Sequence, residues 1–393
     1  MLKEKIQKLS GDYADEFIQI RHHLHAHPEL SYREFETSKY VQAKLKEWGI
    51  DFEVMATTGV IGIIKGKNPG KRVIALRADL DALPITEENK VAYRSQNEGV
   101  MHACGHDVHT TCLLGAAKIL NELKEAWEGT VKLIFQPGEE KNPGGASLLI
   151  KEGVLENPKP DAIFALHVHP NLEVGKLSFR CGMVMASADE IYITVKGKGG
   201  HAAAPHLTSD TILAASQLVV NLQQLVSRMN NPFNPSVLSI TSVQGGNTTN
   251  VIPSEVKLMG TFRAMNEEWR FRAHDLIKEI CRNTAGISGV ETEVTIDVGY
   301  PFVINNAELT DKAKRKAAEY AGEQNVEETE MRMGAEDFAF YSHIIPACFF
   351  RLGVGNIKNN ITSGVHTPTF NIDEDAIKNG MGIMAWLAVS DSD

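Results

Sequence analysis

The sequence predicts an α/β protein with two domains, one of which is inserted into the other. The chain has 393 residues, whereas a single hydrophobic core stops growing near roughly 250–300 residues. Near both ends of the chain, apolar strands alternate with helices, as is typical of an α/β layered domain. Between these parts the elements follow the order β-α-β-β-α-β, which is the ferredoxin-like split motif.

The first part of the chain begins with helices. Residues 2–25 have helical character, and this helix is expected to end before Pro28, because proline disfavours the helical conformation in the residue before it. A second helix is expected at 38–48, ending at Gly49. The elements expected next are strands at 51–55, 59–65 and 72–79, a helix at 108–127, a strand at 130–135, a helix at 146–152 and a strand at 161–166.

The pattern changes near Ser187. The elements expected there are a strand at 190–195, a Gly-rich turn at 197–200, a helix at 209–229, strands at 236–243 and 255–263, a helix at 267–283 and a strand at 291–298. The α/β pattern then returns with helices at 308–320 and 337–343, a strand at 347–352 and a helix at 373–389. We therefore expect a discontinuous α/β domain at 1–186 and 300–393, and an inserted domain at 187–299.

Composition narrows the classes of function. Fifty acidic residues against 40 basic ones give a formal charge of −10, which repels phosphate backbones and anionic lipids. We therefore expect no nucleic-acid partner and no membrane partner. The first residues lack the apolar region of a signal peptide, and five scattered cysteines are not the pattern of a disulfide framework. A cytoplasmic protein is expected.

The densest group of reactive side chains lies at the start of a predicted helix. It contains His102, Cys104, His106, Asp107 and His109. A thiolate is stabilised at a helix N-terminus, and a thiolate with an imidazole suits zinc or another late divalent metal. Taken alone, the run is as compatible with a solvated polar loop as with a metal site.

A second group, Glu139-Glu140, follows a predicted apolar strand. Adjacent residues of an extended chain point to opposite sides, so one carboxylate can bind a metal while the other faces a bound water. An exposed acidic turn is the alternative. His167 follows another strand, and His366 lies in a late loop. Ligands of α/β folds bind beyond the C-terminal ends of strands, so these positions together favour a functional site.

Nine motifs in combination resemble those of the M20 metallopeptidase and amidohydrolase family. The resemblance is to the branch of N-acyl-L-amino acid amidohydrolases, hippurate hydrolases and plant IAA-amino acid hydrolases. The motifs are RHHLHAHPELS at 21–31, ALRADLDALPI at 75–85, HACGHDVH at 102–109, FQPGEE at 135–140, LHVHP at 166–170, GKGGHAAAPH at 197–206, NVIP at 250–253, GTFR at 260–263 and GAEDF at 334–338.

The resemblance implies a Zn-exopeptidase-like catalytic domain with a ferredoxin-like lid and dimerisation domain. It also implies that two divalent metal ions per subunit (Zn, Mn, Co or Ni) are held by Cys104, His106, Glu140, His167 and His366. Glu139 would be the general base. Cys104 stands where other branches of the family have a bridging Asp, and Asp79-Leu80-Asp81 stands where they have H-x-D.

The inserted domain would contribute to the same reaction. By the resemblance, His201 would stabilise the oxyanion from the partner subunit of a homodimer. Asn250 and Arg263 would bind the carboxylate of the substrate, although Arg263 could equally be a surface ion-pair partner. Glu336-Asp337 would first be expected to cap a helix, and a supporting or substrate-facing role is the alternative.

The function implied is metal-dependent hydrolysis of the amide bond of N-acyl-L-amino acids, of the N-acetyl or N-benzoyl type, to a carboxylate and a free amino acid. The alternatives are a dipeptidase of the same family and a non-catalytic metal-binding or ligand-binding protein. His22, His23, His25 and His27 are expected to have packing and surface roles, because they lie at the end of a predicted helix and no carboxylate or thiol partner is expected nearby.

Overall fold

The computed structural model describes residues 1–390, which form two compact units. Unit 1 comprises Met1–Val184, Ile304–Glu330 and the chain from Asp337 onward. Unit 2 comprises Met185–Val303 and the short segment Met331–Glu336. The expected inserted domain at 187–299 did not include that short segment.

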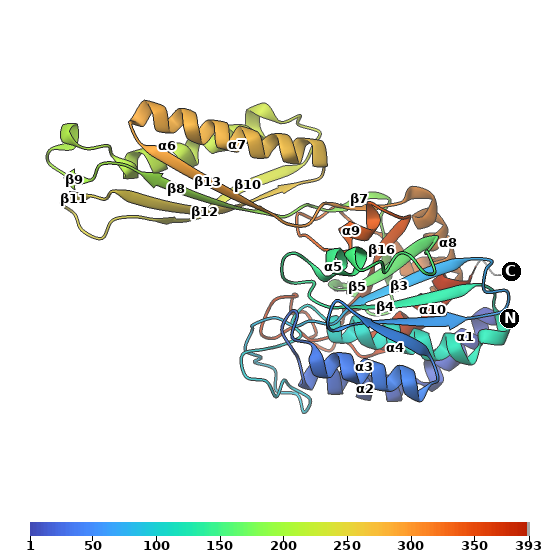
Figure 1. The fold of residues 1–393 in the computed structure, drawn as a ribbon. Helices are drawn as coiled ribbons and strands as arrows, with labels where there is room; N and C mark the ends of the chain where they lie inside the picture. Colours follow the sequence, from blue (N-terminus) through green and yellow to red (C-terminus); the bar gives the residue numbers. More distant parts are fainter. Residues whose placement is uncertain (391–393) are drawn as a thin grey trace. The chain divides into compact units, whose positions relative to one another are not determined.

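The core of unit 1 is a mixed sheet of eight strands in the order β1-β2-β4-β3-β5-β16-β6-β15 (Figure 1). The strands β4, β3, β5 and β16 run parallel to one another, while β1, β2 and β6 each add an antiparallel neighbour. Their bounds are β1 Asp51–Met55, β2 Gly59–Lys65, β3 Val73–Asp79, β4 Thr130–Gln136, β5 Ala162–Glu173, β6 Leu177–Phe179, β15 Val326–Glu328 and β16 Ala347–Gly355.

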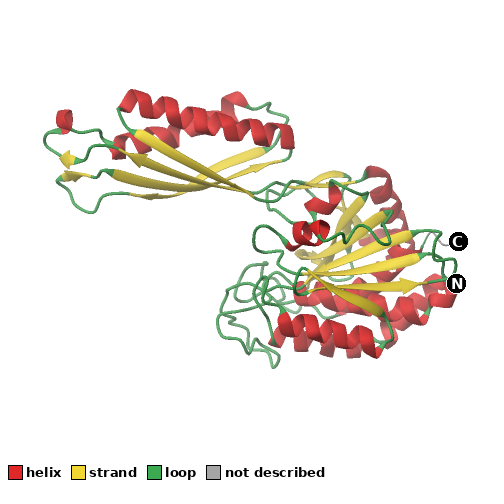
Figure 2. Cartoon of the chain, in the orientation of Figure 1, coloured by secondary structure: helices red, strands yellow, loops and turns green. Residues whose placement is uncertain are grey.

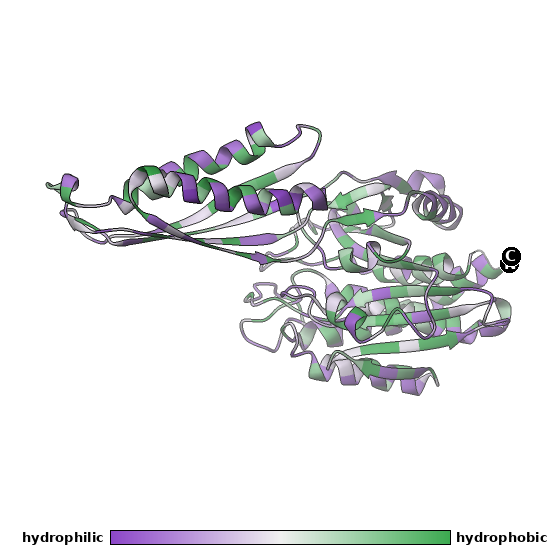
Figure 3. Ribbon diagram, turned by 45° about the horizontal axis from the view of Figure 1, so that its top comes forward, coloured by the Kyte–Doolittle hydropathy of each residue, from purple (hydrophilic) through white to green (hydrophobic). Residues whose placement is uncertain are grey.

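The central strands are buried along nearly their whole length, and Figure 3 shows them as mostly hydrophobic. Such strands are typical of a sheet covered on both faces. In Figure 1, α4 lies on one side of the sheet and α5 and α9 lie on the other. The helices of unit 1 are α1 Leu2–Asp12, α2 Ala14–Ala26, α3 Phe35–Glu47, α4 His106–Glu122, α5 Gly145–Lys151, α8 Ala307–Ala321, α9 Ala339–Ser342 and α10 Asp375–Val389.

The helix expected at 2–25 is two helices, α1 and α2, separated at Tyr13. Both helices pack against α4 and α10, but α1 lies mainly against α10 and α2 mainly against α4. This tertiary packing explains a break that no proline marks. Among the described residues, no helix combines the length and the hydrophobicity needed to cross a bilayer.

Unit 2 has an antiparallel sheet in the order β10-β12-β8-β13, with α6 and α7 packed on one face (Figure 2). The bounds are β8 Asp189–Lys196, α6 Thr211–Gln224, β10 Ser236–Gln244, β12 Glu255–Ala264, α7 Glu267–Ser288 and β13 Glu291–Val298. The chain order is β-α-β-β-α-β. The predicted fold class, an α/β layered domain with a ferredoxin-like insertion, is therefore confirmed.

Unit 2 also carries a small two-stranded ribbon outside its main sheet. It pairs β9 (Gly200–His201) with β11 (Val251–Ile252). Two further short strands, β7 (Gly182–Met185) and β14 (Val303–Asn305), lie where the chain passes from one unit to the other.

Candidate metal centre

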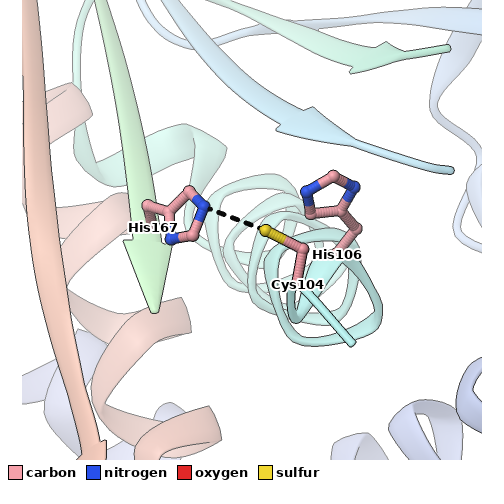
Figure 4. A group of neighbouring side chains, drawn as sticks. All are labelled: Cys104, His106 and His167. Atoms are coloured by element: carbon pink, nitrogen blue, oxygen red, sulfur yellow. Dashed lines mark hydrogen bonds between the residues drawn. The ribbon is translucent and has the colours of Figure 1, made fainter. Parts of the chain in front are cut away.

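Gly105 shapes the turn that leads into α4. Its φ of 88° is in the left-handed region, and a Cβ added there would lie 2.5 Å from Cγ2 of Val168. Only glycine accepts both this conformation and this close approach. The turn places Cys104 and His106 side by side, facing His167 in the middle of β5 (Figure 4), a strand that continues to Glu173 and so extends beyond the predicted end at residue 166.

The five predicted ligands lie together at one end of the unit 1 sheet. Cys104 Sγ is 3.5 Å from His167 Nε2 and 3.3 Å from His366 Nε2. Glu140 Oε1 is 3.3 Å from His366 Nε2 and 3.9 Å from His106 Nε2. A backbone hydrogen bond of 2.8 Å from His366 to Ala103 ties the late loop to the turn before α4.

The rings of His106 and His167 are oriented by backbone carbonyls. His106 Nδ1 donates to the carbonyl oxygen of Asp81 at 2.9 Å, and His167 Nδ1 donates to that of Val168 at 2.8 Å. Because Nδ1 carries the proton in each ring, Nε2 carries a lone pair and is free to bind a metal.

Buried polar atoms in this cluster support the presence of a cation. His106 Nε2 is buried and has no hydrogen-bond partner among residues 1–390, and Glu140 Oε1 is buried with His366 Nε2, at 3.3 Å, as its close polar neighbour. Leaving a buried polar atom such as His106 Nε2 unpaired is costly, and a divalent metal ion would satisfy it. Thiolate, imidazole and carboxylate together suit a late divalent metal such as zinc.

Two of the groups of donor atoms that could hold a metal ion consist of predicted ligands alone. Cys104, His106 and His167 make one, and Cys104, Glu140 and His366 make the other. Within each group the ligand atoms lie within 4.8 Å of one another. Cys104 belongs to both, and the residues of the two groups fit a centre that would hold two metal ions.

The electrostatics of the cluster also favour a cation. Hydrogen bonds with Cys104 and Glu140 raise the pKa of His366 to about 10. Burial raises the pKa of Cys104, and the charge of Glu140 raises it further. The cluster therefore holds protons where a metal would otherwise supply positive charge, and metal binding would release them.

Glu139 is buried beside these donors. Its Oε2 lies 4.0 Å from His106 Nε2, and its Oε1 lies 3.4 Å from the backbone nitrogen of Asp337. The two adjacent carboxylates Glu139 and Glu140 thus share the neighbourhood of His106. This arrangement can place a base next to a metal-bound water.

His109 was part of the His-rich run, but both of its nitrogens are occupied. Nδ1 donates to Asp79 Oδ1 at 2.6 Å, and Nε2 accepts from the backbone nitrogen of Val168 at 2.9 Å. His109 is therefore not a free ligand. It supports Asp79, whose Oδ2 lies 3.8 Å from His106 Nε2.

The expectation that His25 has no carboxylate partner nearby is wrong. Its ring is buried between two carboxylates, with Nδ1 2.8 Å from Asp107 Oδ2 and Nε2 3.1 Å from Glu87 Oε1. Arg21 Nε donates to the same Asp107 oxygen at 2.8 Å. Since Asp107 follows His106, this network fixes the first turn of α4. No local pattern predicts this network, because these partners are 62 to 86 residues apart in the sequence.

Asp337 does not take the helix-capping role that was expected first. The helix α9 begins at Ala339, and Phe338 is its N-cap residue. The carboxylate of Asp337 instead accepts hydrogen bonds from Arg77 on β3 and from the backbone nitrogen of Ala146 in α5.

The remaining predicted residues lie in unit 2. His201 is exposed in β9, and Asn250 directly precedes Val251, the residue paired with His201 across the ribbon. The structure thus brings His201 and Asn250 together. Arg263 lies on β12, where its Nε donates to Thr261 Oγ1 at 3.1 Å. Among the described residues, no hydrogen bond or ion pair joins Arg263 to the other two.

Comparisons with known proteins agree with the fold and the site. Residues 75–390 match the model of Peptidase family M20/M25/M40. The chain is 40% identical over 393 residues to Thermostable carboxypeptidase 2 of Saccharolobus solfataricus, covering 99% of this chain and 98% of that protein. It is 42% identical over 306 residues to an N-acyl-L-amino acid amidohydrolase of Geobacillus stearothermophilus, covering 78% of this chain and 82% of that protein.

A solved structure shows the same fold. The YXEP protein of Bacillus subtilis, described as a dinuclear metal binding peptidase from the M20 family, superposes with a TM-score of 0.82 at 35% sequence identity. The match covers 97% of this chain and 99% of that one. As its motifs predicted, the chain belongs to peptidase family M20/M25/M40.

Proposed function

We propose that this protein hydrolyses the amide bond of N-acyl-L-amino acids, giving a carboxylate and a free amino acid. Its family membership makes it a metal-dependent amidohydrolase. The observation that carries the proposal is the position of Glu139 beside the cluster of metal donors. A site that only holds metal gains nothing from a second, repelling carboxylate, whereas a hydrolase needs a base there.

The proposed metal ligands are Cys104, His106, Glu140, His167 and His366, which would hold two divalent ions. Metal ions bound there would acidify a water molecule and polarise the amide carbonyl. Glu139 would accept the proton of the attacking water at Oε2 and return it to the leaving amine. Its buried position next to His106 supports this role.

Unit 2 would complete the site in a homodimer. His201 of the partner subunit would donate a hydrogen bond to the oxyanion that forms during attack. Asn250 and Arg263 would bind the carboxylate of the amino-acid part. In support, His201 and Asn250 lie together in an exposed ribbon of unit 2. Light scattering would then give twice the chain mass of 43.2 kDa.

The test is amine release from N-acetyl amino acids, N-benzoyl amino acids and dipeptides. Reduced protein is reconstituted with manganese, zinc, cobalt or nickel and compared with chelated protein. We expect metal-dependent release from N-acyl amino acids, with the ranking of substrates naming the acyl group. Absence of release from every N-acyl substrate in protein that binds two metals would contradict the proposal.

Cleavage at the C-terminus of peptides is a second candidate. The similarity to Thermostable carboxypeptidase 2 favours it. The bond and the leaving group are the same, and only the acyl part differs, because it is itself an amino acid or a peptide. Turnover of dipeptides in preference to N-acetyl and N-benzoyl amino acids would identify this activity.

A further inference from the structure

A buried arginine connects Asp79, which lies beside the proposed ligand His106, with Asp337, which lies beside the proposed base Glu139. The side chain of Arg77, on β3, has no exposed surface. Its Nη1 donates to Asp79 Oδ2 at 2.6 Å, and its Nη2 donates to Asp337 Oδ1 at 2.7 Å. Asp79 in turn stands beside His106. One guanidinium thus bridges two carboxylates that approach the site from separate parts of the chain.

Asp337 is held more tightly than a single ion pair would hold it. Gln136 Nε2 lies 2.8 Å from each of its carboxylate oxygens, and the backbone nitrogen of Ala146 donates to Oδ2 at 3.0 Å. With Arg77, the two oxygens therefore face donors from β3, β4 and α5. Charge-assisted hydrogen bonds of this kind are among the strong ones in proteins.

The backbone nitrogen of Asp337 faces the proposed base. It lies 3.4 Å from Glu139 Oε1, while the other carboxylate oxygen of Glu139 is the one nearer His106. A carboxylate held by one oxygen presents the other in a fixed direction. The position of the Asp337 N–H depends on the position of the Asp337 side chain. Hydrogen bonds from Arg77, Gln136 and the backbone nitrogen of Ala146 hold that side chain in place.

We propose that Asp337, clamped by Arg77 and Gln136, is a positioning residue that aims Glu139 at the attacking water. This inference rests on the proposed role of Glu139 as general base. Asp337 itself acts through its backbone N–H and does not touch the reacting atoms. Residues of the motifs ALRAD at 75–79 and GAED at 334–337 would thus act together to position Glu139.

The test compares Asp337→Asn with Asp161→Asn. Asp161 is a matched control, because its carboxylate also accepts from a backbone nitrogen, that of Val73, at the opposite end of β3. We expect D337N to lower kcat by about 10- to 100-fold, a part of the roughly 10²- to 10⁴-fold supplied by general base catalysis. KM and the metal content should stay unchanged, and D161N should match the wild type.

A double variant separates positioning from a general structural effect. If Asp337 acts through Glu139, adding D337N to Glu139→Gln should cause no further loss of the residual activity. An equal loss in both backgrounds, or loss of metal in D337N, would overturn the inference. If D337N does not fold, Gln136→Met takes its place in the test, because it leaves all charges in place. It should lower kcat by less than is expected for D337N, again with no further loss in the Glu139→Gln background.

Crystal structures of wild type and D337N give a readout that needs no turnover. Glu139 should keep its contact with the backbone nitrogen of residue 337 in the wild type and lose it in the variant. An unmoved Glu139 in D337N would overturn the inference. If the wild type cleaved no N-acyl amino acid, the proposed substrate class would fail while this structural comparison still tested the clamp.

Discussion

Single side chains decide whether this cluster can bind metal. His106 and His167 each give up Nδ1 to a backbone carbonyl and keep Nε2 for the centre. The placement of reactive residues after strands, together with the family motifs, allowed all five donors to be proposed from the sequence. The burial of Arg21, His25 and Asp107 as one network could not be predicted, because neither periodicity nor spacing tells which distant charged residues pair in a core.

His102 leads to a prediction at this scale. Its ring is buried and neither nitrogen has a hydrogen-bond partner among the described residues. Burial lowers its pKa from 6.5 to about 4. Between these values the unfolded chain binds the proton and the folded chain does not, so stability falls as the pH falls. At about 1.4 kcal/mol per unit, His102 should remove about 3 kcal/mol of stability between pH 6.5 and 4.

Urea unfolding of chelated protein at several pH values would measure this effect. The stability of His102→Gln should depend less steeply on pH than that of the wild type across this window. Other titrating groups contribute to both proteins and cancel in the difference. Parallel pH profiles for the two proteins would show that His102 is not held neutral in the fold.

At the scale of secondary-structure elements, the longer strands and helices can be predicted from the local pattern of hydrophobic residues in the sequence. The strands β1 and β2 have the bounds that their sequence predicted. The strands β6 and β15 have three residues each and were not predicted, because so short a segment shows no period. They form only because β16 offers an edge on which β6, and then β15, can pair.

The turn before α4 can be tested by one substitution and a matched control. Gly105→Ala would add a Cβ against Val168 in a left-handed residue. We expect a loss of about 2–5 kcal/mol in the free energy of unfolding, combining roughly 1–2 for the conformation and 1–3 for overpacking. Metal affinity should also fall, because Cys104 and His106 flank the turn.

Gly99→Ala is the control for Gly105→Ala. Gly99 also has a positive φ, of 78°, but nothing lies within 4 Å of an added Cβ. Gly99→Ala should lower the free energy of unfolding by only about 1–2 kcal/mol and leave metal affinity unchanged. Equal effects of the two variants on metal binding, measured by calorimetry, would show that the contact with Val168 does not shape the site.

At the scale of the whole molecule, the chain combines two units with separate hydrophobic cores. All the proposed metal ligands belong to unit 1, whereas His201, Asn250 and Arg263 belong to unit 2. This division explains why the sequence of each unit could predict its own fold. The assembly of a complete site from both units, in a homodimer, remains a proposal.

Removal of metal should therefore affect the two units differently. A ligand at 100 times its Kd stabilises the folded state by about 2.7 kcal/mol. Chelation should lower the unfolding temperature of unit 1 and leave that of unit 2 unchanged. Differential scanning calorimetry, with tryptophan fluorescence of Trp269 in α7 as a probe of unit 2 in variants lacking the other tryptophans, would follow the two transitions. An equal shift of both transitions would contradict this assignment.

The most direct test of the proposed function is the Glu139→Gln variant, assayed for metal content and amine release together. Two metal ions per chain should remain, because Glu139 is not among the proposed ligands. Turnover of N-acyl-L-amino acids should fall by about 10²- to 10⁴-fold, the contribution expected of a general base. Full activity in a variant that keeps its metal would contradict the account.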